Sequence, residues 1–240
     1  MSKLLEITSL RGGYEKEGFI LQGIDLTLSK GEAVGIIGLN GSGKSTLGKA
    51  IVNLIPYRRC RNILYNGKSI ENNSASELAQ RGIVLMHQGG IVFPNLTVWE
   101  NLSVARGRKI DKDYFEQLES AIPLLRQPKF NLMHIMSDTL SGGQRHELAL
   151  AMTLLKKPQL VIMDEPSAGL SPKAVQEIYA MLSKLREALG LTILLIEQNI
   201  NQAVEFCDRC LLIEQGRVRQ EFVNADINEI EAVMFGTNTQ

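Results

Sequence analysis

The stretch GLNGSGKST at positions 38–46 constrains the fold of this chain more than any other. It fits the pattern G-x-x-x-x-G-K-[ST], follows the strand-like run 32–37 and opens a helix-periodic segment over 44–54. A strand–loop–helix unit of this kind turns backbone N–H groups around phosphates, and the helix dipole favours the same anions. The sequence therefore predicts a phosphate cradle, in which Lys44 reaches the outer phosphates and the Ser45 hydroxyl binds Mg²⁺.

Strand-like and helix-periodic segments alternate along most of the chain. Strands are expected over 3–8, 20–28, 32–37, 61–65, 82–87, 159–163, 191–196 and 210–214, and helices over 44–54, 74–80, 141–155, 172–189 and 199–206. Several strands are near-continuous apolar runs, which is typical of parallel strands covered on both faces. We therefore expect an α/β fold with a mostly parallel sheet, fed by an antiparallel N-terminal part. Residues 97–139 show no strand pattern and predict a helical insertion, and YNGK at 65–68 predicts a hairpin.

Charge and hydropathy exclude some classes of protein. The 26 basic and 26 acidic residues balance, so no nucleic-acid partner is indicated. No apolar run approaches the roughly 18–20 residues that span a bilayer, and the N-terminus does not resemble a secretory signal. We therefore expect a cytoplasmic protein whose Cys60, Cys207 and Cys210 are reduced thiols. CDRC at 207–210 has redox or zinc spacing, but no second pair completes a metal site, which favours two semi-buried thiols.

A second motif, LVIMDEP at 160–166, is a buried strand that ends in two carboxylates. Asp164 is suited to hold Mg²⁺ through water, and Glu165 to polarise an attacking water molecule. Taken alone, Asp-Glu before Pro166 would equally mark the start of a helix. Together with the phosphate cradle it predicts a nucleoside triphosphatase, although kinases and motor ATPases remain open at this point.

A third motif, LSGGQ at 140–144, opens the helix expected over 141–155. Ser141 suits an N-cap, and Gly142 and Gly143 leave backbone N–H groups uncovered. In isolation these residues would be an ordinary capped helix start. With the cradle present they form a second anion site, which one nucleotide in one chain does not need. A head-to-tail dimer, in which each Ser141 loop closes on phosphates held by the partner's Lys44, accounts for both sites.

In their order and spacing these motifs resemble those of the ATP-binding subunits of ABC transporters, and the resemblance covers essentially the whole chain. It implies a P-loop ABC ATPase core over residues 1–240 as a single domain, with a helical subdomain over about 89–155. It also implies ATP hydrolysis with ATP and Mg²⁺ as cofactors. The nucleotide-contacting residues implied are Tyr14, Gly38, Asn40, Gly41, Ser42, Gly43, Lys44, Ser45, Thr46, Ser141, Gly142, Gly143 and Gln144.

The resemblance assigns roles to further side chains. Tyr14 is similar to the aromatic residue that stacks on adenine, although it is also read as an ordinary turn tyrosine. Gln88 in LMHQGG resembles the glutamine that contacts Mg²⁺ and the attacking water, in a loop where the membrane subunit docks. The implied metal set is Ser45, Gln88 and Asp164, and the implied catalytic set is Glu165, Gln88 and Gln198. SAGLS at 167–171 occupies the place of the dimer-contacting loop, with Ser171 where the family usually has Asp.

The strand LTILLI at 191–196 leads to a departure from the family pattern, because Gln198 stands where most members have a histidine that contacts the γ-phosphate. A glutamine amide donates a hydrogen bond to a phosphate oxygen but carries neither a proton nor a positive charge. We therefore expect a sensor that works by hydrogen bonding, the alternative being a helix cap or a solvated side chain. EQN here, with FPNLTVWENL and EPSAGLSP, resembles the branched-chain amino acid and urea uptake ATPases.

The resemblance implies that ATP closes a head-to-tail dimer and that hydrolysis reopens it, which powers solute transport, in the direction of import. Because the chain has no spanning segment, the pathway belongs to separate permease subunits, at the inner face of the cell membrane. The second ATP-binding subunit is the same chain or a different one. The alternative function is a soluble ABC ATPase that acts as an assembly factor of the iron–sulfur type. An ABC protein of nucleic-acid maintenance or translation is a third hypothesis, but the long arms or tandem domains that favour it are absent.

Overall fold

The computed structural model describes residues 2–106, 111–224 and 226–236. Two sheets organise it, one of five strands in the order β2-β1-β5-β6 with β4 beside β1, the other of six in the order β11-β10-β3-β9-β8-β7. The strands are β1 Lys3–Gly13, β2 Leu21–Ser29, β3 Ala33–Ile37, β4 Tyr57–Arg59, β5 Asn62–Tyr65, β6 Lys68–Ser69, β7 Ile83–Met86, β8 Leu160–Asp164, β9 Thr192–Ile196, β10 Arg209–Glu214 and β11 Arg217–Val223. The smaller sheet is antiparallel, and the larger is parallel except for β11.

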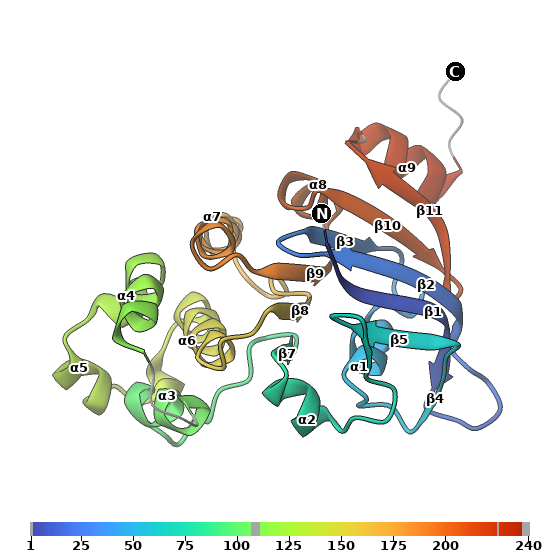
Figure 1. The fold of residues 1–240 in the computed structure, drawn as a ribbon. Helices are drawn as coiled ribbons and strands as arrows, with labels where there is room; N and C mark the ends of the chain where they lie inside the picture. The colour runs from blue at the N-terminus through green and yellow to red at the C-terminus, as the bar shows by residue number, and fades with distance from the viewer. Residues whose placement is uncertain (1, 107–110, 225, 237–240) are drawn as a thin grey trace.

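Helices cover both faces of the larger sheet (Figure 1). They are α1 Lys44–Ile51, α2 Ala75–Gln80, α3 Val98–Arg106, α4 Lys112–Ala121, α5 Lys129–His134, α6 Gly142–Leu154, α7 Pro172–Leu189, α8 Ile200–Phe206 and α9 Ile227–Phe235, with 3₁₀ turns at Pro123–Arg126 and Ser137–Thr139. The expected α/β fold, with a mostly parallel sheet and an antiparallel N-terminal part, is confirmed. The Asn-Gly hairpin is present as the β5–β6 turn, where Tyr65 pairs with Lys68.

The side chains of the parallel strands alternate between two covered faces of the sheet, which explains why the sequences of these strands are continuous apolar runs. Leu160 and Ile162 of β8 face the cluster that contains α1 and the antiparallel sheet. Val161 and Met163 face the opposite cluster, which is built with α3, α4, α6 and α7. Neighbouring residues on a strand point to opposite faces, so both faces of these strands are apolar because both are covered.

Elements that were not expected from the sequence lie at the edges. Within the described part of the chain, strand β11 pairs only with β10, and of its side chains only Phe222 is buried. An edge strand with one inward residue carries little hydrophobic periodicity, so its pattern resembles that of a loop. Strand β1 also runs beyond the expected residue 8, because its second half pairs with both β2 and β4.

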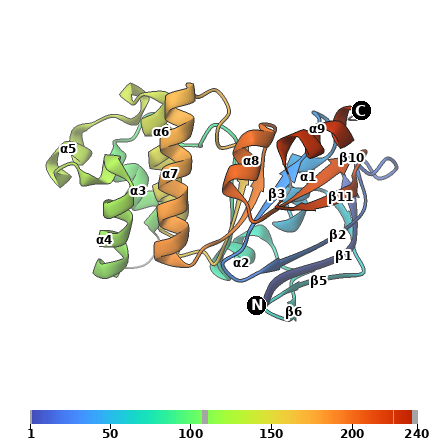
Figure 2. The ribbon, with the colours of Figure 1, turned by 90° about the horizontal axis from the view of Figure 1, so that it is seen from above.

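The helical elements between β7 and β8 form an arm beside the larger sheet. From above, α3, α4 and α5 lie on the far side of α6 and α7 from the sheet (Figure 2). This agrees with helices over 97–139, although residues 107–110 of that insertion lie outside the described part. A bridge between Thr97 and Met136 brings the two ends of the excursion together. Among the described residues, no helix is both long and apolar enough to cross a membrane.

The base of this arm is held by a wholly buried side chain, Asn101 of α3. Its Oδ1 accepts the Phe93 N–H at 2.7 Å, and its Nδ2 lies 3.1 Å from the Phe93 carbonyl and 3.0 Å from the Thr97 carbonyl. The same Nδ2 is 3.3 Å from both the Leu96 carbonyl and the Ser137 Oγ. One amide therefore fastens the chain that enters the arm to the chain that leaves it.

The pair Cys207 and Cys210 packs against β3. Both cysteines are free thiols, Cys210 buried and Cys207 half-buried. A Cβ added to Gly35 would lie 2.7 Å from the Cys210 Sγ and 3.3 Å from the Cys207 Sγ. The two sulfur atoms thus fill the space left by one glycine, which is a packing role.

Replacing Asn101 with Ala is expected to lower the free energy of unfolding by about 2–3 kcal/mol, because the Phe93 N–H would lose its partner and the buried position would lose its hydrogen bonds to the entering and leaving chain. Urea denaturation measures this loss. The control is Ser103→Ala on the same helix, at an exposed position, for which a change within about 0.5 kcal/mol is expected. Equal stability of the two variants would show that Asn101 does not hold the arm.

Candidate functional site

The carboxyl ends of three adjacent parallel strands bring the candidate residues together. Strand β3 lies beside β9, and β9 lies beside β8, with Ile36 and Asp164 both in register with Ile196. Residues 38–46 follow β3, Glu165 follows β8, and Glu197 and Gln198 follow β9. Ligands of open α/β sheets bind at this edge, so the fold itself assembles segments that lie far apart in the sequence.

The loop after β3 is a cradle in which Gly38, Gly41 and Gly43 all have positive φ. Gly38 has φ +149°, and a Cβ on it would lie 2.3 Å from the Ile213 carbonyl oxygen. Gly43, with φ +107°, is the N-cap of α1. Lys44 is 5% exposed, and its Nζ donates to the Gly38 carbonyl at 2.8 Å and the Leu39 carbonyl at 3.1 Å. The lysine is therefore folded back along the loop, where a phosphate would meet its ammonium group.

Two of the three residues expected to hold Mg²⁺, Ser45 and Asp164, are already paired, whereas the third, Gln88, contacts Glu165. The Ser45 Oγ donates to the Asp164 Oδ1 at 2.8 Å. Both groups are oxygen donors, which suits a hard cation. Among the described residues, no group of three His, Cys, Asp or Glu side chains could hold a metal. A Mg²⁺ ion here would therefore take its other ligands from phosphate oxygens and water, as it does in many nucleotide sites.

Glu165 occupies an unusual backbone conformation. Its φ is +48°, in a region that residues other than glycine rarely adopt. The backbone is held from both sides, since the Glu165 N–H donates to the Ile196 carbonyl at 2.9 Å and its carbonyl accepts the Ala168 N–H at 3.1 Å. Its carboxylate accepts the Gln88 Nε2 at 3.0 Å. The structure thus brings Gln88, from the loop after β7, onto the carboxylate that follows β8.

The electrostatics of this edge favour a basic carboxylate. Desolvation raises the pKa of Glu165, and the nearby Asp164 and Glu197 raise it further, against the opposing effect of Lys44. Desolvation also lowers the pKa of Lys44, while the three carboxylates raise it. A carboxylate with a raised pKa is a stronger base, which is the property needed to accept a proton from water.

The LSGGQ segment is a capped helix start. The Ser141 Oγ accepts the Gln144 N–H at 3.3 Å, and the Gln144 Oε1 accepts the Ser141 N–H at 3.0 Å. A Cβ on Gly142 would lie 3.7 Å from Leu170, and one on Gly143 would lie 3.8 Å from Ala174, so the segment lies against the end of the loop before α7 and the first turn of α7. Within the described chain, no hydrogen bond joins residues 141–144 to the cradle.

The remaining candidates lie at the rim. Tyr14 is 46% exposed, in the loop between β1 and β2. Asn40 and Gly41 are exposed, whereas Ser42 and Thr46 are buried. Gln198 is exposed, and within the described residues its side chain forms no hydrogen bond. These positions leave Tyr14, Asn40 and Gln198 accessible to a ligand from solvent.

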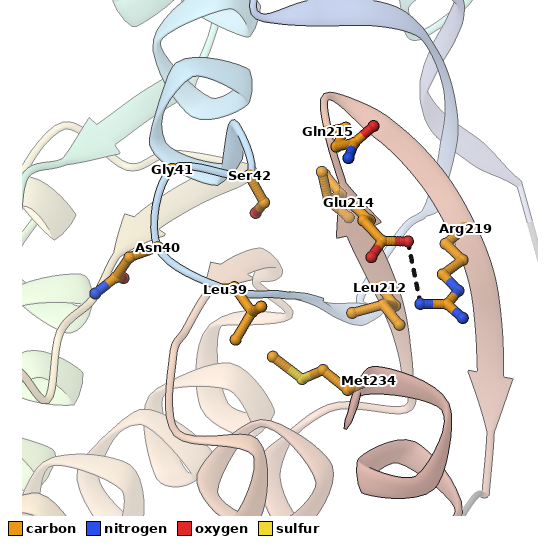
Figure 3. Close-up of a pocket in the computed structure, with 10 residues that line it drawn as sticks. Leu39, Asn40, Gly41, Ser42, Leu212, Glu214, Gln215, Arg219 and Met234 are labelled. Carbon is orange, nitrogen blue, oxygen red and sulfur yellow. Dashed lines mark hydrogen bonds and ion pairs between the residues drawn. The ribbon is translucent and has the colours of Figure 1, made fainter. Parts of the chain in front are cut away.

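A small cavity of about 230 Å³ lies on the outer side of the cradle (Figure 3). Its walls are residues 39–42, the end of β10, the turn after it, and Met234 of α9. Glu214 and Arg219 form an ion pair of 3.1 Å at one side. The C-terminal β10–β11 hairpin and α9, which the sequence did not reveal as parts of the site, therefore support the cradle from outside.

Gly216, in the β10–β11 turn, is a site residue that sequence reasoning missed. Its N–H donates to the Ser42 carbonyl at 2.9 Å, and its carbonyl accepts the Gln22 N–H at 2.8 Å. It has φ +73°, and a Cβ on it would lie 1.7 Å from the Ile20 carbonyl oxygen. Its sequence, EQGR, marks a turn but gives no sign of which loop the turn supports.

Comparisons with known proteins show what this chain is similar to. A sequence profile of the family described as ABC transporter matches residues 21–168. A protein of Archaeoglobus fulgidus named a probable branched-chain amino acid transport ATP-binding protein, LivF, is 38% identical over 230 residues, covering 95% of this chain and 94% of that one. BraG of Pseudomonas aeruginosa, named a high-affinity branched-chain amino acid transport ATP-binding protein, is 36% identical and covers 82% and 84%. LptB of Escherichia coli, from a lipopolysaccharide export system, is 30% identical and covers 83% and 82%.

Solved structures have the same fold. CbiO1 from Clostridium perfringens, described as part of an ABC transporter complex, matches with a TM-score of 0.79 and 26% identity, covering 100% of this chain and 96% of that one. The ATP-binding cassette MJ0796, described as dimeric and bound to ADP and Pi in a post-hydrolysis state, matches with a TM-score of 0.75 and 23% identity, covering 93% and 100%. At that identity the second likeness concerns the fold alone.

Gly216→Ala is expected to weaken binding of Mg-ATP and to lower the melting temperature, because the new methyl group would displace the turn from the Ile20 carbonyl and the cradle. The matched control is Gly236→Ala, where φ is +69° and a Cβ would meet nothing within 4 Å. The control should lose only about 1 kcal/mol of stability, the backbone cost of a positive φ, and keep its affinity. Nucleotide titration and thermal melting measure both effects, and equal affinities would remove the turn from the site.

Proposed function

This chain belongs to the ABC transporter family and is an ATP-binding subunit of that type. We propose that it hydrolyses ATP in a head-to-tail pair of such subunits. The whole chain, residues 1–240, is proposed to act as one ATPase domain. Residues of about 89–155 would be its helical subdomain. The observation that carries the proposal is the meeting of the cradle, Asp164, Glu165 and Gln88 at one sheet edge.

ATP binding is assigned to the cradle and its rim. Backbone N–H groups of residues 38–46 would surround the β- and γ-phosphates, with Lys44 leaving its two carbonyl partners to meet the outer phosphates. Tyr14, exposed in the loop between β1 and β2, would stack on adenine. Mg²⁺ bound by Ser45 and Asp164, with Gln88 nearby, would offset charge on the phosphates.

The hydrolytic step is assigned to Glu165. Its carboxylate, with a pKa raised by desolvation, would accept a proton from the water that attacks the γ-phosphate. Gln88, which now donates to that carboxylate at 3.0 Å, would orient the same water. Gln198, at the end of β9, would donate its amide to the γ-phosphate. That role needs no titration, because a glutamine amide does not change charge with pH.

The LSGGQ segment is assigned to the partner's nucleotide. Ser141 and the glycines after it lie at the amino end of a thirteen-residue helix, where the dipole favours an anion. Within one chain this end faces the 165–170 loop rather than the cradle. A second subunit arranged head to tail would supply the missing half of each site, and SAGLS at 167–171 would line the contact between them.

Partners, the direction of transport and the location are further parts of the proposal, which the resemblance in sequence and the names of two relatives support. LivF and BraG are named for branched-chain amino acid transport, so we assign this chain to uptake of small solutes through separate permease subunits. Its place would be the cytoplasmic face of the cell membrane. None of the three relatives described above is named as an assembly factor, and no feature of the site favours that alternative.

Glu165→Gln is expected to lower the rate of ATP hydrolysis by at least about 100-fold, because the amide cannot accept the proton from water. ATP binding should survive, so that an ATP-bound dimer accumulates and is seen by size-exclusion chromatography with light scattering. Glu187→Gln, an exposed position on α7, serves as the control and should turn over normally. Undiminished turnover in Glu165→Gln would exclude Glu165 as the base.

Ser141→Arg is expected to block dimer closure while the monomer still binds ATP, because the arginine would occupy the space of the partner's phosphates. Hydrolysis should then fall together with dimer formation, and the dissociation constant for ATP in the monomer should change less than about two-fold. Ser120→Arg, exposed on α4, is the control for adding a charge to the arm. Loss of ATP binding by the Ser141→Arg monomer would contradict a site shared between two subunits.

A further inference from the structure

The residue that β9 delivers to the interior is Glu197, one position before the proposed sensor. Its side chain is 1% exposed, and its backbone N–H donates to the Ile36 carbonyl at 3.1 Å. Among the described residues it forms no ion pair. Burying a carboxylate in this way is costly unless hydrogen bonds compensate for the lost water.

Three donors compensate for it. The Tyr179 hydroxyl donates to the Glu197 Oε1 at 2.7 Å. The Glu197 Oε2 accepts the backbone N–H groups of Gln198 at 3.1 Å and Asn199 at 3.3 Å. An ionised carboxylate is a hydrogen-bond acceptor only, so it suits three converging donors, whereas a neutral amide would bring its own N–H groups into the same space.

The two backbone bonds fix the turn that carries Gln198. Asn199 is the N-cap of α8, and its Oδ1 accepts the Gln202 N–H at 3.3 Å. The Gln198 backbone is thereby held between the end of β9 and the start of α8. Among the described residues its exposed side chain forms no hydrogen bond, so the Glu197 carboxylate fixes the backbone position from which the Gln198 amide extends.

The third bond connects this turn to another part of the site. Tyr179 lies on α7, the helix whose N-cap, Ser171, ends the loop that begins at Glu165. Burial and the Glu197 charge raise the pKa of Tyr179, so its hydroxyl stays protonated and able to donate. The Tyr179 ring also packs edge to face on Phe206 of α8, with centroids 5.5 Å apart. Helices α7 and α8 therefore meet at this carboxylate.

We propose that Glu197 is a positioning residue for ATP hydrolysis: its buried carboxylate holds the backbone of Gln198 in the place where the amide meets the γ-phosphate, and Tyr179 ties that turn to α7. The inference rests on the proposed function of Gln198 and assigns Glu197 no contact with the nucleotide. In the part of the chain that the structure describes, no side-chain hydrogen bond of this network reaches the cradle, but the Glu197 charge acts on Lys44 and Glu165. Tyr179→Phe keeps that charge, so the loss that it causes should appear in turnover and not in ATP binding, and this variant carries the test of the route through Gln198.

The test uses three single variants, Glu197→Gln, Tyr179→Phe and Gln198→Ala. It also uses two double variants, in which Gln198→Ala is combined with Glu197→Gln or with Tyr179→Phe. For each variant, kcat, KM for ATP and the melting temperature are measured. Tyr114→Phe is the control, since the Tyr114 hydroxyl also donates at 2.7 Å, to the Leu154 carbonyl in the helical arm, although Tyr114 is half-buried and Tyr179 is buried. Glu197→Gln and Tyr179→Phe should each lower kcat about ten-fold, which corresponds to about 1.4 kcal/mol, and Tyr179→Phe should change KM less than two-fold. In the Gln198→Ala background Tyr179→Phe should not lower kcat further.

A merely structural role would give a different pattern. The melting temperature of Tyr179→Phe would then fall as that of Tyr114→Phe does, while both variants kept the wild-type kcat. That result would overturn the proposal. An effect of Tyr179→Phe on kcat that persists in the Gln198→Ala background would also overturn it, because the route through Gln198 would be wrong. If Gln198→Ala alone keeps the wild-type kcat, the sensor role of Gln198 fails, and the positioning role fails with it. Neither result affects the assignment of Glu165. Should Glu197→Gln not fold, Tyr179→Phe still decides between the two patterns.

Discussion

Parallel pairing among β3, β9 and β8 is the constraint on which the site depends. Each strand is buried on both faces, and a slip of one residue in register would exchange the side chains of the two apolar clusters. The hydrophobic pattern therefore fixes the register, and the register fixes which residues leave the sheet at its carboxyl edge. Asp164 lies beside Ile196 because Leu160 lies beside Thr192, four pairs away. Chemistry at the edge is thus positioned by packing inside the sheet.

Local patterns in the sequence carry the central part of this fold and most of the candidate site. The cradle is local, since its glycines, Lys44 and Ser45 lie within one strand–loop–helix unit. The capped start at Ser141 is local too, and the structure adds the reciprocal bond from Gln144. Helix 172–189 has the same bounds as α7, because Ser171, Pro172 and Gly190 mark both ends within the sequence.

What the sequence did not reveal depends on contacts between distant segments. Gly216 supports the cradle from a hairpin about 170 residues further along the chain, and an isolated Gln-Gly turn does not identify its partner. Asn101 is an asparagine in a helix, and nothing beside it in sequence indicates that it is wholly buried. Glu197 was visible as a polar residue after a strand. Its burial and its bond to Tyr179 arise from the packing of α7 and α8.

The closure at the base of the helical arm acts together with the packing of the outer helices. Val98 N–H donates to the Ile135 carbonyl at 2.9 Å, and Ser137 N–H donates to the Leu96 carbonyl at 3.1 Å, so the excursion leaves and re-enters the core at one place. The hydrogen bonds at this place fix the path of the chain from β7 into α3 and from α5 to Ser141. Buried residues between the two points, such as Leu118 of α4 and Leu132 of α5, belong to the same apolar cluster as Leu148 of α6 and Leu182 of α7. The outer helices are therefore held both by their closed base and by their packing on the two long helices.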